Sequence, residues 1–192
     1  MNDNKINRFW VFFEEIASEI LAKTEDEKII ATIDDEVSKL GNITWEYGPL
    51  ENDYYFCLSP NFKFDLIPYT DYAISLSPNL NGWRFLSGKP QKLDATDEIC
   101  FLETDGSEIS VSTKNWRAVT YKFKDGTYDI DFLIDMNSDE DTKYLALNLA
   151  MVNLLGEINY LRKVENIKIV ERFDSNTNQK GIKFSDLIDV IT

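Results

Sequence analysis

The sequence predicts an α+β fold in which an antiparallel β-sheet packs against an N-terminal helical hairpin and one long helix in the C-terminal half. Apolar residues recur at three- and four-residue spacing before residue 41. Short strand-like runs bounded by Gly, Pro and Asp-Gly then follow up to residue 135. The 192 residues fit a single domain, 1–192, which is long enough to bury a core without disulfides or metals.

The N-terminal hairpin is predicted from two amphipathic segments. In residues 4–22 the apolar side chains, including Phe9 and Phe13, fall on one helical face, and glutamates occupy the solvent positions. In the second segment Thr24 is expected to cap the helix, with Glu27 completing a capping box. Each helix has an apolar stripe that must be buried against another element.

The middle of the chain alternates between strands and turn residues. Strands are predicted at 43–47, 54–58 and 83–87, and Pro68 suits the first turn of a helix between them. Two β-hairpins are then indicated by Asp-Gly turns, because Asp-Gly supplies the positive φ of a tight turn. Their strands are 98–103 with 108–112 around Asp105-Gly106, and 116–124 with 127–135 around Asp125-Gly126.

The longest helix is expected over 138–161. Ser138 can cap its first turn, and the three acidic residues that follow complement the helix dipole. Apolar residues lie on more than one side of this helix, so two faces should be covered, either within the chain or, as an alternative, in a homodimer. A strand near 167–170, a loop over 174–180 and a short helix or strand over 184–191 complete the chain.

Composition excludes several classes of function. The net charge is −14, from 20 basic and 34 acidic residues, which argues against nucleic-acid binding and permits attraction to a basic protein partner. The competing interpretation is that this charge only keeps the protein soluble. The chain has no histidine, so Ser-His-Asp and Cys-His catalysis and His-containing zinc sites are excluded. Neither a P-loop nor a G-x-G-x-x-G motif is present. We therefore expect no cofactor, and these exclusions favour a protein that is not an enzyme.

The expected location is the cytoplasm. The first eight residues are polar, and the most apolar segment is interrupted by Asn148, Asn153 and Glu157, so neither a signal peptide nor a membrane span is predicted. Cys57 and Cys100 are well separated and are interpreted as buried free thiols.

One candidate metal site lies on the strand 127–135. Asp129, Asp131 and Asp135 alternate with Tyr128 and Ile130, so they share a strand face and could hold Mg²⁺ or Mn²⁺ for a hydrolase. The competing interpretation is a solvated sheet face, on which polar residues are the rule.

An aromatic cluster supplies the candidate partner-binding residues Trp45, Glu46, Tyr47, Trp83 and Arg84. Alternating aromatics on neighbouring strands usually form core and cross-strand pairs. Facing outward, they would form a surface of the kind that binds proteins. A small-ligand carrier with an aromatic pocket is a further alternative.

Short motifs across most of the chain resemble a set of uncharacterised bacterial cytoplasmic proteins. These motifs are Trp45-Glu46-Tyr47-Gly48-Pro49, Gly82-Trp83-Arg84-Phe85 and Leu155-Gly156-Glu157. The resemblance implies a fold and a location, but no catalytic residues. The small, acidic α+β character is also similar to immunity proteins that neutralise bacterial toxins. Together these features favour a non-enzymatic acidic protein-binding module, with an immunity-type inhibitor of a basic toxin as one form of it.

Overall fold

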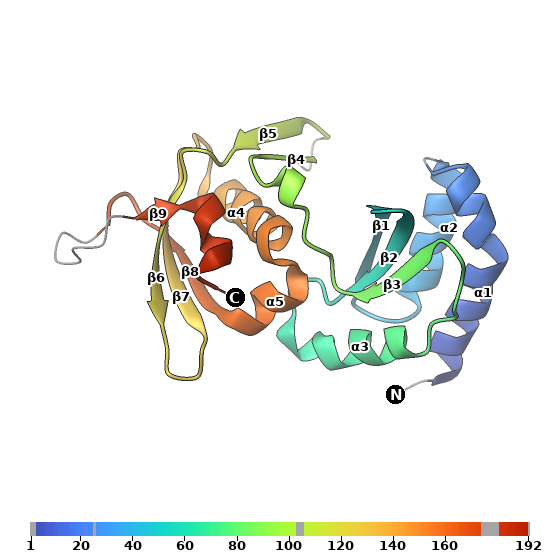
Figure 1. Cartoon of the computed structure of the whole chain (residues 1–192). Coiled ribbons are helices and arrows are strands. Elements are labelled where there is room, and N and C mark those ends of the chain that lie inside the picture. Colours follow the sequence, from blue (N-terminus) through green and yellow to red (C-terminus); the bar gives the residue numbers. More distant parts are fainter. Residues whose placement is uncertain (1–2, 25, 103–105, 174–180, 192) are drawn as a thin grey trace. The chain divides into compact units, whose positions relative to one another are not determined.

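The computed structural model describes residues 3–24, 26–102, 106–173 and 181–191 (Figure 1). Contacts between residues divide the chain into two compact units, Met1–Lys89 and Pro90–Thr192. Both units combine helices with β-sheet, and the predicted α+β class is confirmed. The single domain over 1–192 stays a prediction.

The first unit contains a three-stranded sheet covered by helices. Strand β1 pairs antiparallel with β2, and β2 pairs parallel with β3, in the order β1-β2-β3. The parallel pair requires a crossover, which is provided by α3, and Pro68 lies in its first turn as the sequence predicts. The elements are α1 (Asp3–Ala22), α2 (Glu27–Ser38), β1 (Thr44–Leu50), β2 (Asp53–Ser59), η1 (Phe64–Leu66), α3 (Ile67–Ser75) and β3 (Trp83–Ser87).

The helical hairpin of α1 and α2 is confirmed, but the predicted cap of α2 is wrong. Asp26, and not Thr24, is the N-cap, and its carboxylate accepts hydrogen bonds from the backbone N–H groups of Lys28 and Ile29. Glu27 is consequently the first helical residue, two positions before the one that a capping box requires. A carboxylate at this position also interacts favourably with the positive end of the helix, which explains why it is preferred over the hydroxyl.

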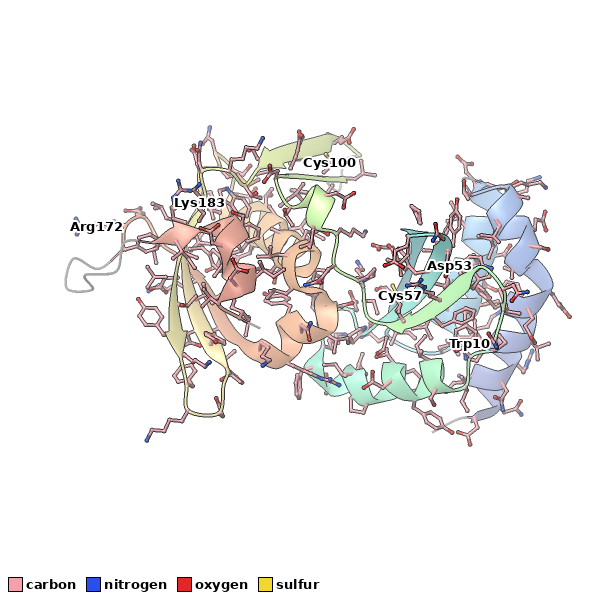
Figure 2. All side chains as sticks on the ribbon, in the orientation of Figure 1. Trp10, Asp53, Cys57, Cys100, Arg172 and Lys183 are labelled. Atoms are coloured by element: carbon pink, nitrogen blue, oxygen red, sulfur yellow. The ribbon has the colours of Figure 1, made fainter. Side chains whose placement is uncertain are left out.

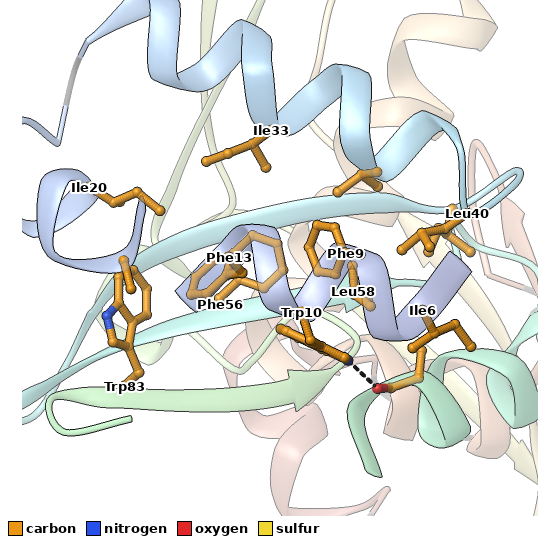
Figure 3. Close-up of a cluster of buried hydrophobic side chains, with 14 residues drawn as sticks. Ile6, Phe9, Trp10, Phe13, Ile20, Ile33, Leu40, Phe56, Leu58 and Trp83 are labelled. Carbon is orange, nitrogen blue, oxygen red and sulfur yellow. Dashed lines mark hydrogen bonds between the residues drawn. The ribbon is translucent and has the colours of Figure 1, made fainter. Parts of the chain in front are cut away.

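The core of the first unit combines aromatic rings with aliphatic side chains (Figure 3). Phe13 of α1 is fully buried, and its ring centroid lies 4.6 Å from that of Phe56 on β2. Trp10 lies edge-on to Phe85 of β3 at 4.9 Å, and its indole N–H donates to the carbonyl oxygen of Ala73 at 2.8 Å. The apolar stripe of α1 is thus turned inward, so its charged side chains point to solvent.

The second unit contains two separate sheets. One is the two-stranded ribbon β4-β5, and the other has the order β8-β7-β6-β9, with β7 and β8 parallel. Both predicted hairpins form, although Asp105 of the first turn lies outside the described residues, as does the predicted loop 174–180. The elements are η2 (Leu93–Ala95), β4 (Glu98–Leu102), β5 (Glu108–Ser112), β6 (Arg117–Lys122), β7 (Tyr128–Leu133), α4 (Glu140–Leu155), α5 (Glu157–Lys163), β8 (Val164–Ile169), β9 (Ile182–Lys183) and η3 (Phe184–Asp189).

The predicted helix over 138–161 is two helices. Asp139 rather than Ser138 is the N-cap of α4, and its carboxylate accepts from the backbone N–H of Thr142 at 2.9 Å. The helix ends at Leu155, because Gly156 has φ 74° and ψ 147°, a conformation that cannot continue an α-helix. Burial on two sides of α4 is confirmed by its buried residues, which are Ala146, Leu147, Ala150, Met151, Val152, Leu154 and Leu155.

None of the helices that the structure describes combines the length and the apolar character that a bilayer crossing requires.

Candidate functional site

The five candidate partner-binding residues do not form one surface. Successive side chains on a strand point to opposite faces, so Glu46 is directed away from its neighbours Trp45 and Tyr47. The register pairs Arg84 of β3 with Tyr55 of β2, and therefore places Arg84 on the face opposite to Trp83. The aromatic members lie on the face that α1 and α2 cover, and the charged members lie on the other.

The three aromatic residues belong to the packing of the first unit. Trp45 stacks on Tyr47 with an interplanar angle of 4°, and its indole N–H donates to the Asp34 carboxylate of α2 at 2.6 Å. The Tyr47 hydroxyl donates to the carbonyl oxygen of Thr24. Trp83 is 8% exposed and lies edge-on to Phe13 at 5.1 Å. These side chains join the sheet to the helical hairpin. This packing fits the interpretation of the aromatic cluster as part of the hydrophobic core.

The two charged residues are engaged within the sheet. The Glu46 carboxylate accepts a hydrogen bond from the Tyr55 hydroxyl, and burial together with this carboxylate raises the pKa of Tyr55. Arg84 forms ion pairs with Glu51 at 2.9 Å and with Asp53 at 3.0 Å, both at the turn between β1 and β2. A partner could contact Arg84 at its exposed side, but its charge is already matched by two carboxylates.

The three aspartates of the proposed metal site each have a separate, neutral hydrogen-bond donor. Asp129 accepts from the side-chain amide of Asn166 at 2.9 Å, and Asp131 accepts from the Tyr121 hydroxyl at 3.1 Å. Asp135 lies beyond the end of β7 and accepts from the side-chain amide of Asn115 at 3.5 Å. In the described part of the chain, no three potential ligands of the types His, Cys, Asp and Glu lie close enough together to hold a metal ion. The alternation of buried Tyr128, Ile130 and Phe132 with half-buried aspartates along β7 fits the solvated-face interpretation.

Both cysteines are free thiols, as the sequence predicts (Figure 2). Cys57 on β2 is fully buried. Cys100 on β4 is exposed, so the prediction that both are buried is wrong for this residue. The two-residue alternation explains the difference, because Cys100 follows the buried Ile99 and points to the opposite face of the ribbon.

Exposed carboxylates gather on the two helices of the hairpin, and we call this set the acidic helical face. Glu19 forms an ion pair with Lys23, and Asp35 with Lys39. Glu14, Glu15 and Glu27 have no basic partner among the residues that the structure describes. The acidic helical face consists of Glu14, Glu15, Glu19, Glu27, Asp34 and Asp35.

Two of the hollows on the described surface lie at the N-terminal half of α1. One, of about 360 Å³, lies along α1 beside Val11 and Phe12, and Val11 is 56% exposed. The other, of about 270 Å³, lies between α1 and α2 and is lined by Lys5, Arg8, Glu36 and Lys39. Neither hollow is lined by the aromatic cluster on which the ligand-carrier alternative depends.

The acidic helical face follows from a signal that the sequence already contains. The glutamates of 4–22 occupy the positions between the apolar ones, and that spacing alone predicts their exposure. The sequence does not reveal that the aromatic side chains of β1 and β3 pack against these helices. Because of this packing, the outer sides of the helices are the solvent-exposed surface of the hairpin. Comparison with known proteins adds no relative, since no family model, no curated protein and no solved structure matches the chain.

Proposed function

We propose that the chain is a non-enzymatic protein-binding module whose acidic helical face binds a basic surface of another protein. The observation that supports this proposal is the set of exposed carboxylates on α1 and α2 that lack basic partners within the described residues. In a chain of net charge −14, such a face attracts a basic protein during diffusional encounter.

The packing beneath the face favours recognition by a preformed surface. Phe9 and Phe13 hold α1 on the sheet, and Ile33 and Val37 of α2 are buried in the same core. Trp45 bonds to Asp34 and so joins the sheet directly to the helix that carries part of the acidic helical face. Because packing already fixes these helices in the free protein, binding of a partner would cost little conformational entropy in the helices.

An inhibitor of a basic toxin or of another basic bacterial protein is the form of this function that we propose. Such an inhibitor needs a surface that associates fast and covers basic residues, and electrostatic attraction supplies the association rate. Catalysis is not required of it.

The first experiment is capture of partners from a lysate at low and high salt, with the bound proteins identified. A basic partner that is released as salt rises is the expected result, since salt screens attraction between exposed charges. The captured protein is then used for measurement of association rates with the purified chain.

Two triple variants test the location of the surface. Glu14→Gln, Glu15→Gln and Glu27→Gln together remove charge from the acidic helical face, and should lower the association rate about tenfold at low salt. Glu140→Gln, Glu165→Gln and Glu171→Gln remove the same charge from exposed positions of the second unit. Equal effects of the two triples would show that net charge alone matters, and would contradict a site on the helical hairpin.

A further inference from the structure

The β4-β5 ribbon has an unpaired edge. Its sheet has two strands in the described part of the chain, and β4 is the strand that lies against α4. Strand β5 is thus the outer strand of the ribbon, as Figure 1 shows. An isolated two-stranded ribbon is marginal in water, and one more pair of strands would stabilise it.

The backbone groups of β5 alternate between β4 and the free edge. The Thr113 N–H donates to the carbonyl oxygen of Asp97 at 3.1 Å, which marks this position as a hydrogen-bonded pair. Such pairs recur at every second residue of an antiparallel register, so Val111 and Ile109 also bond to β4. The residues that direct their N–H and C=O groups to the free edge are Glu108, Ser110 and Ser112.

This edge carries few of the devices that usually prevent pairing. Edge strands are commonly protected by charged side chains, above all Lys, by Pro, or by being very short. Strand β1 contains Pro49, β3 contains Arg84, β8 contains Lys168, and β9 has two residues. Strand β5, with the sequence Glu-Ile-Ser-Val-Ser, has no Lys, Arg or Pro, and its one charged residue is Glu108 at its first position.

We propose that β5 pairs antiparallel with β5 of a second copy of this chain, around a two-fold axis at Ser110. In that register Ser110 faces Ser110 of the second copy, and Glu108 faces Ser112 of the second copy. All of these residues direct their backbone groups outward, so each pair exchanges both hydrogen bonds. The two ribbons become one four-stranded sheet.

The side chains also suit this register. Ile109 comes to lie opposite Val111 of the second copy, and both belong to the face of the ribbon that is partly or fully buried. No two like charges are directly opposite, because Glu108 meets a serine. An isologous contact of this kind closes on itself and makes a dimer rather than a filament.

The charge of the chain gives the dimer a distinctive response to salt. Two copies of net charge −14 repel each other, and salt screens that repulsion. Dimerisation therefore strengthens as salt rises, whereas binding of a basic partner by the acidic helical face weakens. The two proposals are independent, and their failures are distinguishable by this opposite dependence.

Sedimentation velocity of the full chain, from low micromolar to near-millimolar concentration, tests the dimer at about 50 mM and about 500 mM salt. The expected result is a shift from the 22.3 kDa monomer toward twice that mass as concentration and salt rise. A wild-type chain that stays monomeric under all of these conditions overturns the proposal.

Substitutions at Ser110 locate the interface. Ser110→Pro removes the N–H that points to the free edge, and leaves the bonds between β5 and β4 intact, since Pro is tolerated at such positions. It should weaken the dimer about 30-fold, because both hydrogen bonds at the axis are lost. Ser110→Ala, which loses the same hydroxyl but keeps the N–H, should dimerise like the wild type.

A second variant guards against misfolding of the proline variant. Ser110→Lys keeps every backbone hydrogen bond of the monomer and places two like charges opposite each other at the axis, so it should also be monomeric. If Ser110→Pro and Ser110→Lys both dimerise as the wild type does, the contact lies elsewhere, for example on the segment 138–161, and the proposal is wrong.

Discussion

The two most deeply buried tryptophans should respond differently to the same substitution. Trp10 is 3% exposed, and its indole N–H donates to the carbonyl oxygen of Ala73 at 2.8 Å. Trp116 is fully buried, and its indole N–H has no hydrogen-bond partner among the described residues. Trp10→Phe and Trp116→Phe remove similar amounts of apolar surface, but only the first removes a hydrogen bond.

The difference can be estimated from the separate contributions. Loss of part of a buried indole costs about 1–2 kcal/mol in each variant. Trp10→Phe loses about 1 kcal/mol more with the hydrogen bond, and leaves Ala73 O only the N–H of Leu76 at 3.3 Å. Trp116→Phe instead removes an unsatisfied buried donor, which cost about 1–3 kcal/mol to desolvate. We expect a loss of about 3 kcal/mol for Trp10→Phe, and a change within about 1 kcal/mol of zero for Trp116→Phe.

Urea unfolding followed by far-ultraviolet circular dichroism measures both losses. Tryptophan fluorescence adds information on each unit, since Trp10, Trp45 and Trp83 lie in the first unit and Trp116 lies in the second. In Trp116→Phe the fluorescence therefore reports the first unit, whose midpoint should not move. Equal losses for the two variants would refute the argument from the unsatisfied N–H.

Three further predictions concern residues at the ends of helices. Asp26→Ala should destabilise the chain by about 1 kcal/mol in urea unfolding, whereas Thr24→Val should be nearly neutral, because Asp26 is the cap of α2; a larger loss for Thr24→Val would contradict this assignment. Gly156→Ala should cost about 1–3 kcal/mol, since an L-residue is strained at φ 74° and ψ 147°; a neutral result would mean that the chain relaxes at the break between α4 and α5. Hydrogen bonds from the backbone N–H and the hydroxyl of Thr142 lower the pKa of Asp139 below its usual value of 3.8. The Asp139 carboxylate therefore stabilises the folded chain fully at pH values above its pKa in the unfolded chain, and this stabilisation is lost as the pH falls through its pKa in the folded chain. Asp139→Asn should therefore reduce the dependence of the unfolding midpoint on pH below about 4, and an unchanged dependence would contradict the assignment.

Local signals predicted much of the secondary structure. The apolar spacing of α1 and α2 marked the helical hairpin, and Asp125-Gly126 marked the hairpin of β6 and β7, since Gly126 has φ 90°. The parallel pairing of β2 with β3 was not predicted, because it depends on contacts between segments far apart in sequence. The break at Gly156 was missed for a related reason: a glycine within an apolar run is compatible with a continuous helix unless the chain must turn there.

The candidate site shows the same limit. The alternation Trp45-Glu46-Tyr47 is enough to separate Glu46 from its aromatic neighbours, but it does not say which face the core covers. That choice is made by α1 and α2, whose apolar stripes pack on Trp45, Phe56 and Trp83. The acidic exterior of the helices is predictable locally because a helix that buries one stripe exposes the other.

The division at residue 89 has a consequence for how the chain is made. Every strand of the sheet β1-β2-β3 and every helix of its core lies before Pro90, and none of the strands that the structure describes in the second unit joins that sheet. A ribosome therefore releases all the residues of the first core before it has finished the second, and domains generally begin to fold from the N-terminus during synthesis. The aromatic side chains of α1 would be hidden early, while the strands that close the β8-β7-β6-β9 sheet are still being translated.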